Sequence, residues 1–281
     1  MNRTISKYKF PIFVIFFALI LIIASFILNF EETIYYDASS QGLLQKDLIL
    51  KRIKELGIQK EKDYLMGKFD QTQRADFVLI PKQYSTVPLS DMYLRKEALS
   101  AFIKMAEAAN KDKINLKIAS ATRNFEYQKD IWNNKWSGVT FVDGKSLFKN
   151  TPDELERFKK ILEYSAVPGT SRHHWGGDID INDSTPEYFK TPKGKDVYEW
   201  LNKNAPSYGF CQPYTLRGTA RPKGYNEEKW HWSYLPLAKT FTEQYKDLIV
   251  EKDINNFLGD ENVSGEDLIN DYVLGINPDC I

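Results

Sequence analysis

The sequence predicts an α+β protein with an N-terminal membrane-spanning helix, and three observations support this prediction. Short strand-like segments are interspersed with helical ones, without the regular strand–helix alternation of a doubly wound sheet. Hydrophobic residues make up 42% and charged residues 27% of the 281-residue chain, which are ordinary values for a globular protein with a core. A long apolar run lies near the N-terminus.

That run, from Phe10 to Leu28, is apolar at every position except Ser25. About 20 apolar residues in a helix cross a bilayer, so the run is long enough. Basic residues precede it and acidic residues follow it, which keeps the basic end in the cytoplasm and exports the rest. A cleaved signal peptide is the alternative, but it usually ends at a small-x-small site, which the end of this run does not offer. We therefore expect an uncleaved signal anchor.

The first half of the exported part predicts four elements. Residues 43–56 carry apolar residues at helical spacing and end before Gly57, which indicates an amphipathic helix. Residues 77–80 form a short apolar run before a proline, which indicates a strand. Residues 95–111 are rich in Ala, Glu and Lys with an apolar stripe, as in a helix. Residues 114–120 alternate as in a strand.

The second half predicts further helices and strands of the same short lengths. Good helix formers and capping residues indicate helices at 125–136, 152–164 (opened by Thr151) and 195–204. Alternating or aromatic-rich runs indicate strands at 176–182 and 230–234. The last thirty or so residues are acidic and carry helical fragments.

These elements predict four segments along the chain. Residues 1–30 form a cytoplasmic basic stub and the transmembrane signal anchor, 31–75 a juxtamembrane helical segment, 76–245 the folded domain and 246–281 an acidic tail. Lys+Arg and Asp+Glu are 38 each, so the net charge of zero does not indicate a nucleic acid as partner. Cys211 and Cys280 lie in the exported part and either form a disulfide or stay as two buried thiols.

The three histidines lie in two short segments, His173 and His174 in SRHHWGGDIDIN and His231 in EKWHW. Histidine is the commonest metal ligand, and catalytic zinc typically takes three protein ligands and one water. Asp178 and Asp180 alternate with isoleucines, so a strand would place both carboxylates on one face. A packed histidine or a solvent-facing strand would explain either segment alone. Together the two segments predict a metal site.

Glu228 precedes His231 by three residues, where a carboxylate can act as a base on a metal-bound water. Two other motif matches are set aside. Ser146 to Lys149 reads SxxK, but no Ser-Asp-Asn or Lys-Thr-Gly element accompanies it. Gly138 and Gly144 approximate a nucleotide-binding loop whose spacing is one residue too long.

The motifs Ser-x-His-x6-Asp at 171–180 and Glu-x-x-His at 228–231 together resemble the LAS zinc metallopeptidases (lysostaphin, D-Ala-D-Ala metallopeptidases and sonic hedgehog). The match is closest to the VanY-like D-alanyl-D-alanine carboxypeptidases. The segment IASATRNFEYQ at 118–128 is similar to the family's strand, Arg and Tyr-Gln segment. The resemblance covers residues 77–237 and implies a small antiparallel sheet that carries the zinc site, flanked by helices.

Carried over position by position, the resemblance implies that His173, Asp180 and His231 are the zinc ligands. It implies Glu228 as the catalytic base and Arg123 as the group that stabilises the oxyanion. It also implies that Ser171 and Gln128 lie near the substrate. The Zn²⁺ ion is the implied cofactor. Asp178 departs from the family, which usually has a small residue there. It would compete with Asp180 as ligand or accept a hydrogen bond from a ligating histidine, and spacing from His173 favours Asp180.

The implied activity is zinc-dependent hydrolysis of the terminal D-Ala-D-Ala bond of peptidoglycan stem peptides, by an enzyme of the bacterial cell envelope that is anchored in the membrane. The alternatives are an L,D-carboxypeptidase, a peptidoglycan endopeptidase, or a non-catalytic zinc- or wall-binding module. Such a module would lack the base or the arginine. Both Glu228 and Arg123 are present, which favours an enzyme.

Overall fold

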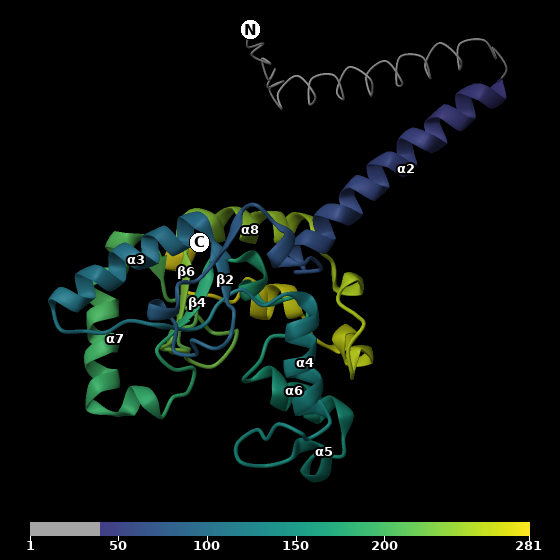
Figure 1. Cartoon of the computed structure of the whole chain (residues 1–281). Helices are drawn as coiled ribbons and strands as arrows, with labels where there is room; N and C mark the ends of the chain where they lie inside the picture. The colour runs from purple at the N-terminus through teal and green to yellow at the C-terminus, as the bar shows by residue number, and fades with distance from the viewer. Residues whose placement is uncertain (1–39) are drawn as a thin grey trace, which may run out of the picture. The chain divides into compact units, whose positions relative to one another are not determined.

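The computed structural model describes residues 40–281, with side chains from residue 48 onward (Figure 1). By its internal contacts the chain divides into a unit that ends at Gln59 and a second unit from Lys60 to Ile281. The described α-helices are α2 (Ser40–Leu65), α3 (Lys96–Lys111), α4 (Phe125–Trp136), α5 (Leu147–Asn150), α6 (Glu154–Leu162), α7 (Pro192–Asn204) and α8 (Leu235–Leu248). The described strands are β1 (Phe77–Leu79), β2 (Tyr93–Arg95), β3 (Ile118–Ser120), β4 (Asp178–Ile181), β5 (Phe210–Cys211) and β6 (His231–Tyr234).

A four-stranded antiparallel sheet in the order β3-β4-β6-β5 forms the centre of the second unit, and β1 pairs with β2 in a separate two-stranded sheet. The pairing of β4 with β6 sets three pairs opposite each other: Asp178 and Ser233, Ile179 and Trp232, Asp180 and His231. Opposed residues of antiparallel strands point to the same face, and successive residues point to opposite faces. The fold is therefore α+β with a small antiparallel sheet, as predicted, and one face of that sheet gathers the polar side chains.

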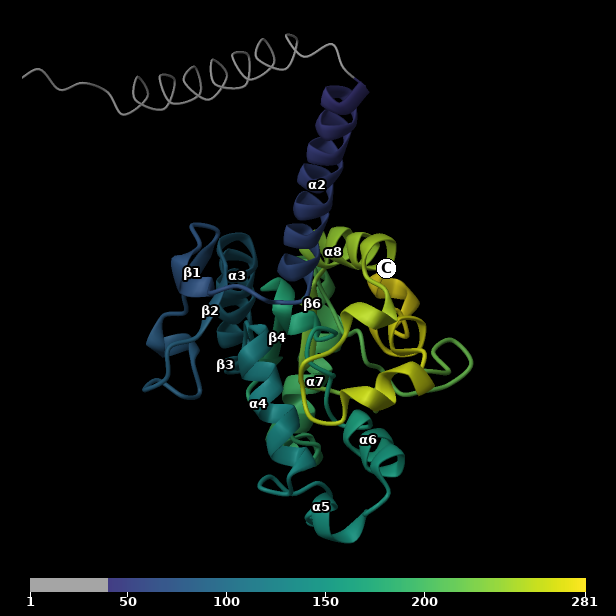
Figure 2. The same cartoon turned by 90° about the vertical axis from the view of Figure 1, so that its right-hand side faces the viewer.

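Two hydrophobic clusters stabilise this unit. Ile179, Ile181 and Trp232 of the sheet pack with side chains of α3 and α7 in the first cluster. The second cluster joins α4, α6, α8 and the C-terminal residues, and α4 and α6 lie side by side (Figure 2). The isoleucines of β4 thus face the first cluster, and the aspartates between them point the other way.

The C-terminal residues belong to this packing although they form only short helical turns. Ile254, Val263 and Val273 are buried in the second cluster. Cys280 is bonded to Cys211 of β5, so of the two alternatives left open by the sequence the disulfide is the one found.

One part of the predicted fold class needs correction. The prediction included an N-terminal helix that spans a membrane, but none of the helices within residues 40–281 is both long and apolar enough to do so. The longest, α2, has 26 residues, and its many Lys and Glu side chains would be costly in a bilayer. The run from Phe10 to Leu28, on which the prediction rested, lies outside the described residues.

The bounds of α2, α6 and α7 also differ from the prediction. α7 begins at Pro192 and not at Lys195, because the Thr191 hydroxyl caps it by accepting a hydrogen bond from the Gly194 backbone N–H at 3.0 Å. α2 continues through Gly57 to Leu65, because a single glycine costs a helix only about 1 kcal/mol and the residues that follow are mostly good helix formers. The side chain that caps α6 is Asp153, which accepts a hydrogen bond from the Glu156 backbone N–H at 2.8 Å, and not Thr151.

Loss of the disulfide should destabilise the fold, because Cys211 and Cys280 lie 69 residues apart and their bond restricts the unfolded chain. We expect Cys280→Ser to lower the free energy of unfolding by about 2–5 kcal/mol, measured by guanidinium denaturation. The double variant Cys211→Ser/Cys280→Ser is the control, since a reductant should leave its stability unchanged while it destabilises the wild type. Equal stability of the oxidised and the reduced wild type would contradict the prediction.

Candidate metal centre

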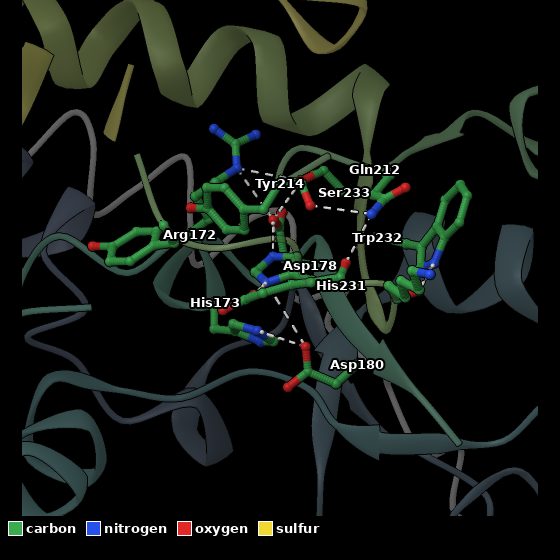
Figure 3. A network of polar contacts seen from close by, with 12 residues as sticks. Arg172, His173, Asp178, Asp180, Gln212, Tyr214, His231, Trp232 and Ser233 are labelled. Carbon is green, nitrogen blue, oxygen red and sulfur yellow. Dashed lines mark hydrogen bonds and ion pairs between the residues drawn. The ribbon is translucent and has the colours of Figure 1, made fainter. Parts of the chain in front are cut away.

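Three side chains from separate elements meet on the polar face of the central sheet (Figure 3). Asp180 and His231 are opposite each other on β4 and β6, and His173 comes from the 3₁₀ turn Arg172–Trp175. That turn ends at Gly176, which has a φ of 71° and turns the chain into β4. All three side chains are buried, and one ligand atom from each lies within 4.8 Å of the others. The structure therefore brings together the three residues predicted as metal ligands.

Hydrogen bonds determine which histidine nitrogens face this cluster. His173 Nδ1 is 2.8 Å from the Ala121 carbonyl oxygen, which can only accept, so Nδ1 carries the proton and Nε2 is free to bind a metal. His231 Nε2 donates to Asp178 Oδ2 at 2.9 Å, so Nδ1 is its metal-facing atom. Burial and the charge of Arg123 lower the pKa of His173, which keeps this imidazole neutral as metal binding requires.

The atoms of the cluster fit a zinc-type ion. His173 Nε2 and Asp180 Oδ1 are buried and have no hydrogen-bond partner among the described residues, and they lie 3.3 Å apart. Two ligand atoms at zinc-bond lengths in a tetrahedral arrangement are also separated by about 3.3 Å. His231 Nδ1 is 3.8 Å from the same Asp180 oxygen. Two nitrogens and one carboxylate leave the fourth position for water or substrate, as in catalytic zinc sites.

Asp178 is placed beside the cluster and not within it. Its Oδ2 accepts hydrogen bonds from three donors: Arg172 Nε at 3.2 Å, His231 Nε2 at 2.9 Å and the Ser233 hydroxyl. Burial by itself raises the pKa of Asp178, but Arg172 and His231 outweigh it and hold the pKa below its usual range. Asp178 therefore stays ionised and orients His231, which is the second of the two roles that the sequence left open.

Glu228 and Arg123 lie next to the three residues. Glu228 Oε2 is 2.9 Å from His231 Nδ1, on the metal-facing side of the imidazole. Burial lowers the pKa of His231, but its hydrogen bonds to Asp178 and Glu228 outweigh this and raise the pKa to about 9. One guanidinium nitrogen of Arg123 is 4.0 Å from Asp180 Oδ2, and its buried Nε has no partner among the described residues. A carboxylate and a guanidinium therefore both lie against the three-residue cluster.

His174 holds the backbone of the arginine. Its Nδ1 donates to the Arg123 carbonyl oxygen at 2.6 Å, and its Nε2 accepts from the Gly169 N–H at 3.0 Å. The Arg123 N–H donates in turn to the His173 carbonyl oxygen at 3.2 Å. Burial lowers the pKa of His174 to about 3, so the ring stays neutral near pH 7. His174 thus links Arg123 to the segment that carries His173.

The two residues predicted to lie near the substrate are placed differently. Ser171 lines a cavity of about 40 Å³ together with His173 and Glu228. Gln128 is buried, donates to the Ala166 carbonyl oxygen at 2.7 Å and has no partner for Oε1 among the described residues. Ser171 therefore borders the centre, whereas Gln128 supports the chain behind it.

Two larger grooves meet at the centre. One of about 680 Å³ reaches Asp180, Arg123 and the β1–β2 loop, and the other, of about 550 Å³, reaches the loop around Asp143. Both are lined by the same five residues: Lys135, Tyr164, Ser184, Glu228 and Trp230. The shared residues place Glu228 at the junction of a groove that extends in two directions.

Several residues of the site were missed from the sequence. The Tyr214 ring packs edge-on against His231 at a centroid distance of 4.9 Å, and Arg172 and Ser233 contact Asp178. Only the position of Arg172 beside the His-His pair could have suggested one of them. Lys135 carries no sequence signal, because it is one of many lysines on the helices of this chain.

Comparison with known sequences gives a family match over residues 91–237, to the family described as VanY: D-alanyl-D-alanine carboxypeptidase. The chain is 30% identical over 166 residues to YodJ of Bacillus subtilis (strain 168), covering 57% of this chain and 53% of that protein. It is 29% identical over 154 residues to a D-alanyl-D-alanine carboxypeptidase of Enterococcus faecalis (strain ATCC 700802 / V583), covering 53% and 51%. The chain thus spans about half the length of these curated relatives.

Solved structures show a likeness as well. The LdcB LD-carboxypeptidase matches with a TM-score of 0.46 and 25% identity, covering 68% of this chain and 82% of that one. A vancomycin-resistance D,D-pentapeptidase VanY in complex with Zn(II) matches with a TM-score of 0.43 and 23% identity, covering 63% and 94%.

The contact between Asp178 and His231 should strengthen metal binding, because a carboxylate that accepts from a ligating histidine fixes its orientation and makes it more basic. We expect Asp178→Asn to weaken zinc affinity by about 10- to 100-fold, measured by competition with a chromophoric chelator. Asp183→Asn is the matched control, since Asp183 only accepts from Thr185 in the loop after β4. Unchanged affinity in a folded Asp178→Asn protein would show that the contact does not support the metal.

Proposed function

The chain belongs to the VanY family of D-alanyl-D-alanine carboxypeptidases, and on this premise we propose that it is a zinc-dependent D,D-carboxypeptidase of peptidoglycan stem peptides. Its metal ligands are His173, Asp180 and His231, its base is Glu228 and its oxyanion group is Arg123. The observation that carries the proposal is the position of the Glu228 carboxylate, 2.9 Å from the metal-facing nitrogen of His231 and beside the three clustered ligand residues.

The proposed chemistry follows from these positions. A zinc ion held by His173, Asp180 and His231 would lower the pKa of a coordinated water towards about 7 and would polarise the scissile carbonyl. Glu228 takes a proton from the attacking water and returns it to the leaving amine. The Arg123 guanidinium, 4.0 Å from Asp180 Oδ2, would meet the negative charge that develops on the carbonyl oxygen. Asp178 and Ala121 keep the two histidines in the tautomers that bind the metal.

Two other substrates fit the same chemistry. An L,D-carboxypeptidase would remove the last residue of a tetrapeptide, and an endopeptidase would cut an internal cross-link. The junction of the two grooves at Glu228 gives room on both sides of the scissile bond, which is the observation that favours the endopeptidase as second candidate.

We also propose that the protein works outside the cytoplasm, in the bacterial cell envelope. The Cys211–Cys280 disulfide supports this location, because disulfides persist mainly in oxidising compartments. Labelling of both cysteines as free thiols, in protein taken from its native compartment, would contradict the location.

Incubation of the zinc-loaded full chain with muropeptides, followed by mass spectrometry, tests the reaction. We expect loss of one D-Ala from pentapeptides, abolished by a chelator and restored by zinc. Loss of D-Ala from tetrapeptides alone would replace the proposal with the L,D activity, and split dimers would replace it with the endopeptidase. No change in any muropeptide would reject an enzymatic function on these substrates.

Substitution of the base separates metal binding from catalysis. We expect Glu228→Ala to retain about one zinc per chain while its turnover falls by about a hundred- to ten-thousandfold, as for loss of a general base. Metal analysis and D-Ala release are the two measurements. Glu227→Ala is the control, because the Glu227 carboxylate lies 3.8 Å from Lys229 Nζ and, among the described residues, forms no hydrogen bond or ion pair with the three ligand residues. Wild-type turnover in Glu228→Ala would remove Glu228 from the mechanism.

A further inference from the structure

A lysine without an ionic partner lies at the junction of the two grooves. Lys135 is in the last turn of α4, is half-buried and lines both grooves together with Glu228. Its ammonium group donates to the hydroxyl of Ser165, which is neutral. No carboxylate of the described residues lies within 4.0 Å of it.

This position is unfavourable for a positive charge. Burial and the charge of Arg123 lower the pKa of Lys135 to about 8, although Glu228 acts in the opposite direction. The lysine is therefore still mostly protonated at pH 7. Charged side chains that leave water are normally paired, because an uncompensated charge loses its hydration without a gain. A position near the C-terminal end of a helix favours a lysine, but it does not require the ammonium to turn into a groove.

The neighbouring charges indicate the sign of the missing partner. Arg123 is the other cation of the same groove and is already close to Asp180. Its buried Nε has no partner among the described residues, and the proposed reaction assigns its guanidinium to the oxyanion. Lys135 is thus the second cation of the groove, and a carboxylate is the anion that a peptide can bring to it.

We propose that Lys135 binds a carboxylate of the peptide substrate and so determines which peptides the groove accepts. The proposal rests on the proposed function, because it assumes that a peptide occupies the groove. Two groups of a short peptide could supply this carboxylate. One is the C-terminus of the leaving residue, and the other is an acidic side chain on the residue before the D-Ala-D-Ala unit.

Four peptides distinguish these sources: acetyl-Glu-D-Ala-D-Ala and acetyl-Gln-D-Ala-D-Ala, each with a free and an amidated C-terminus. If the C-terminus is the source, we expect the wild type to prefer the free acids over the amides, and if the side chain is the source, the Glu peptides over the Gln peptides. The expected preference is about 10- to 100-fold in kcat/KM, the range of a charge-assisted hydrogen bond. In Lys135→Gln that ratio should fall to about one. A loss of the acid-over-amide ratio in Lys135→Gln identifies the C-terminal carboxylate, and a loss of the Glu-over-Gln ratio identifies the side-chain carboxylate.

Lys129→Gln is the matched control, because Lys129 is on the same helix, pairs with Glu126 at 3.5 Å and lines neither groove. It should keep the wild-type ratios. If Lys135→Gln does not fold, Lys135→Met replaces it in the same measurements, because methionine keeps most of the apolar part of the lysine side chain. Calorimetric binding of the four peptides to Glu228→Ala and to Glu228→Ala/Lys135→Gln adds a readout that does not depend on turnover.

The outcomes separate this inference from the function beneath it. A wild type that hydrolyses none of the peptides refutes the D,D activity. A wild type that hydrolyses them with no preference for either carboxylate overturns the role of Lys135 alone. Preferences that persist in Lys135→Gln or Lys135→Met overturn it as well.

Discussion

The antiparallel pairing of β4 with β6 is the constraint on which the rest of the site depends. It sets Asp180 opposite His231 and Asp178 opposite Ser233 on one face, while Ile179 and Trp232 occupy the other. A shift of one residue in this register would send the carboxylates into the hydrophobic cluster and the isoleucines towards the metal. Packing of those apolar residues against α3 and α7 therefore stabilises the geometry of the polar face.

Burial of so many polar groups is tolerated because most of them are connected. Asp178 is fully buried and ionised, and Arg172 balances its charge while His231 and Ser233 satisfy the same oxygen. Such a network stabilises a site only when its members have partners. Five buried atoms around the site have no hydrogen-bond partner among the described residues: Asp178 Oδ1, Arg172 Nη2, Arg123 Nε, His173 Nε2 and Asp180 Oδ1. Of these, His173 Nε2 and Asp180 Oδ1 lie 3.3 Å apart within the three-residue cluster, where one ion would satisfy both.

Residues of α4 and of the segment after α6 form one wall of the site, and the C-terminal residues pack behind these two helices. The disulfide and the buried residues of the tail fix one side of the second hydrophobic cluster, and α4 with α6 fixes another. Lys135 and Tyr164 reach the grooves from this side. The three clustered ligand residues come instead from β4, β6 and the 3₁₀ turn Arg172–Trp175.

Local patterns in the sequence determined much of this protein. Alternation identified β4, good helix formers identified α3 and α4, and the two histidine motifs identified a family that the comparison confirms over residues 91–237. The short strands β2 and β5 were not predicted, because two or three residues carry no usable period and depend on their partner strands. The membrane-spanning helix was predicted from residues outside the described part of the chain, and no described helix takes that role.

Only the tertiary structure decided which neighbours these residues meet. The motifs placed Asp178 and Asp180 on one face without distinguishing their roles. In the structure Asp178 accepts hydrogen bonds from Arg172 and Ser233, whereas Asp180 lies opposite His231 and belongs to the three-residue cluster. Two cysteines became a disulfide because the tail returns to β5. Lys135 resembles every other lysine in the sequence, and its position at the groove became visible only once α4 was packed. Periodicity and motif spacing describe a few consecutive residues, whereas charge, burial and pairing are properties of groups that are distant in the chain and adjacent in space.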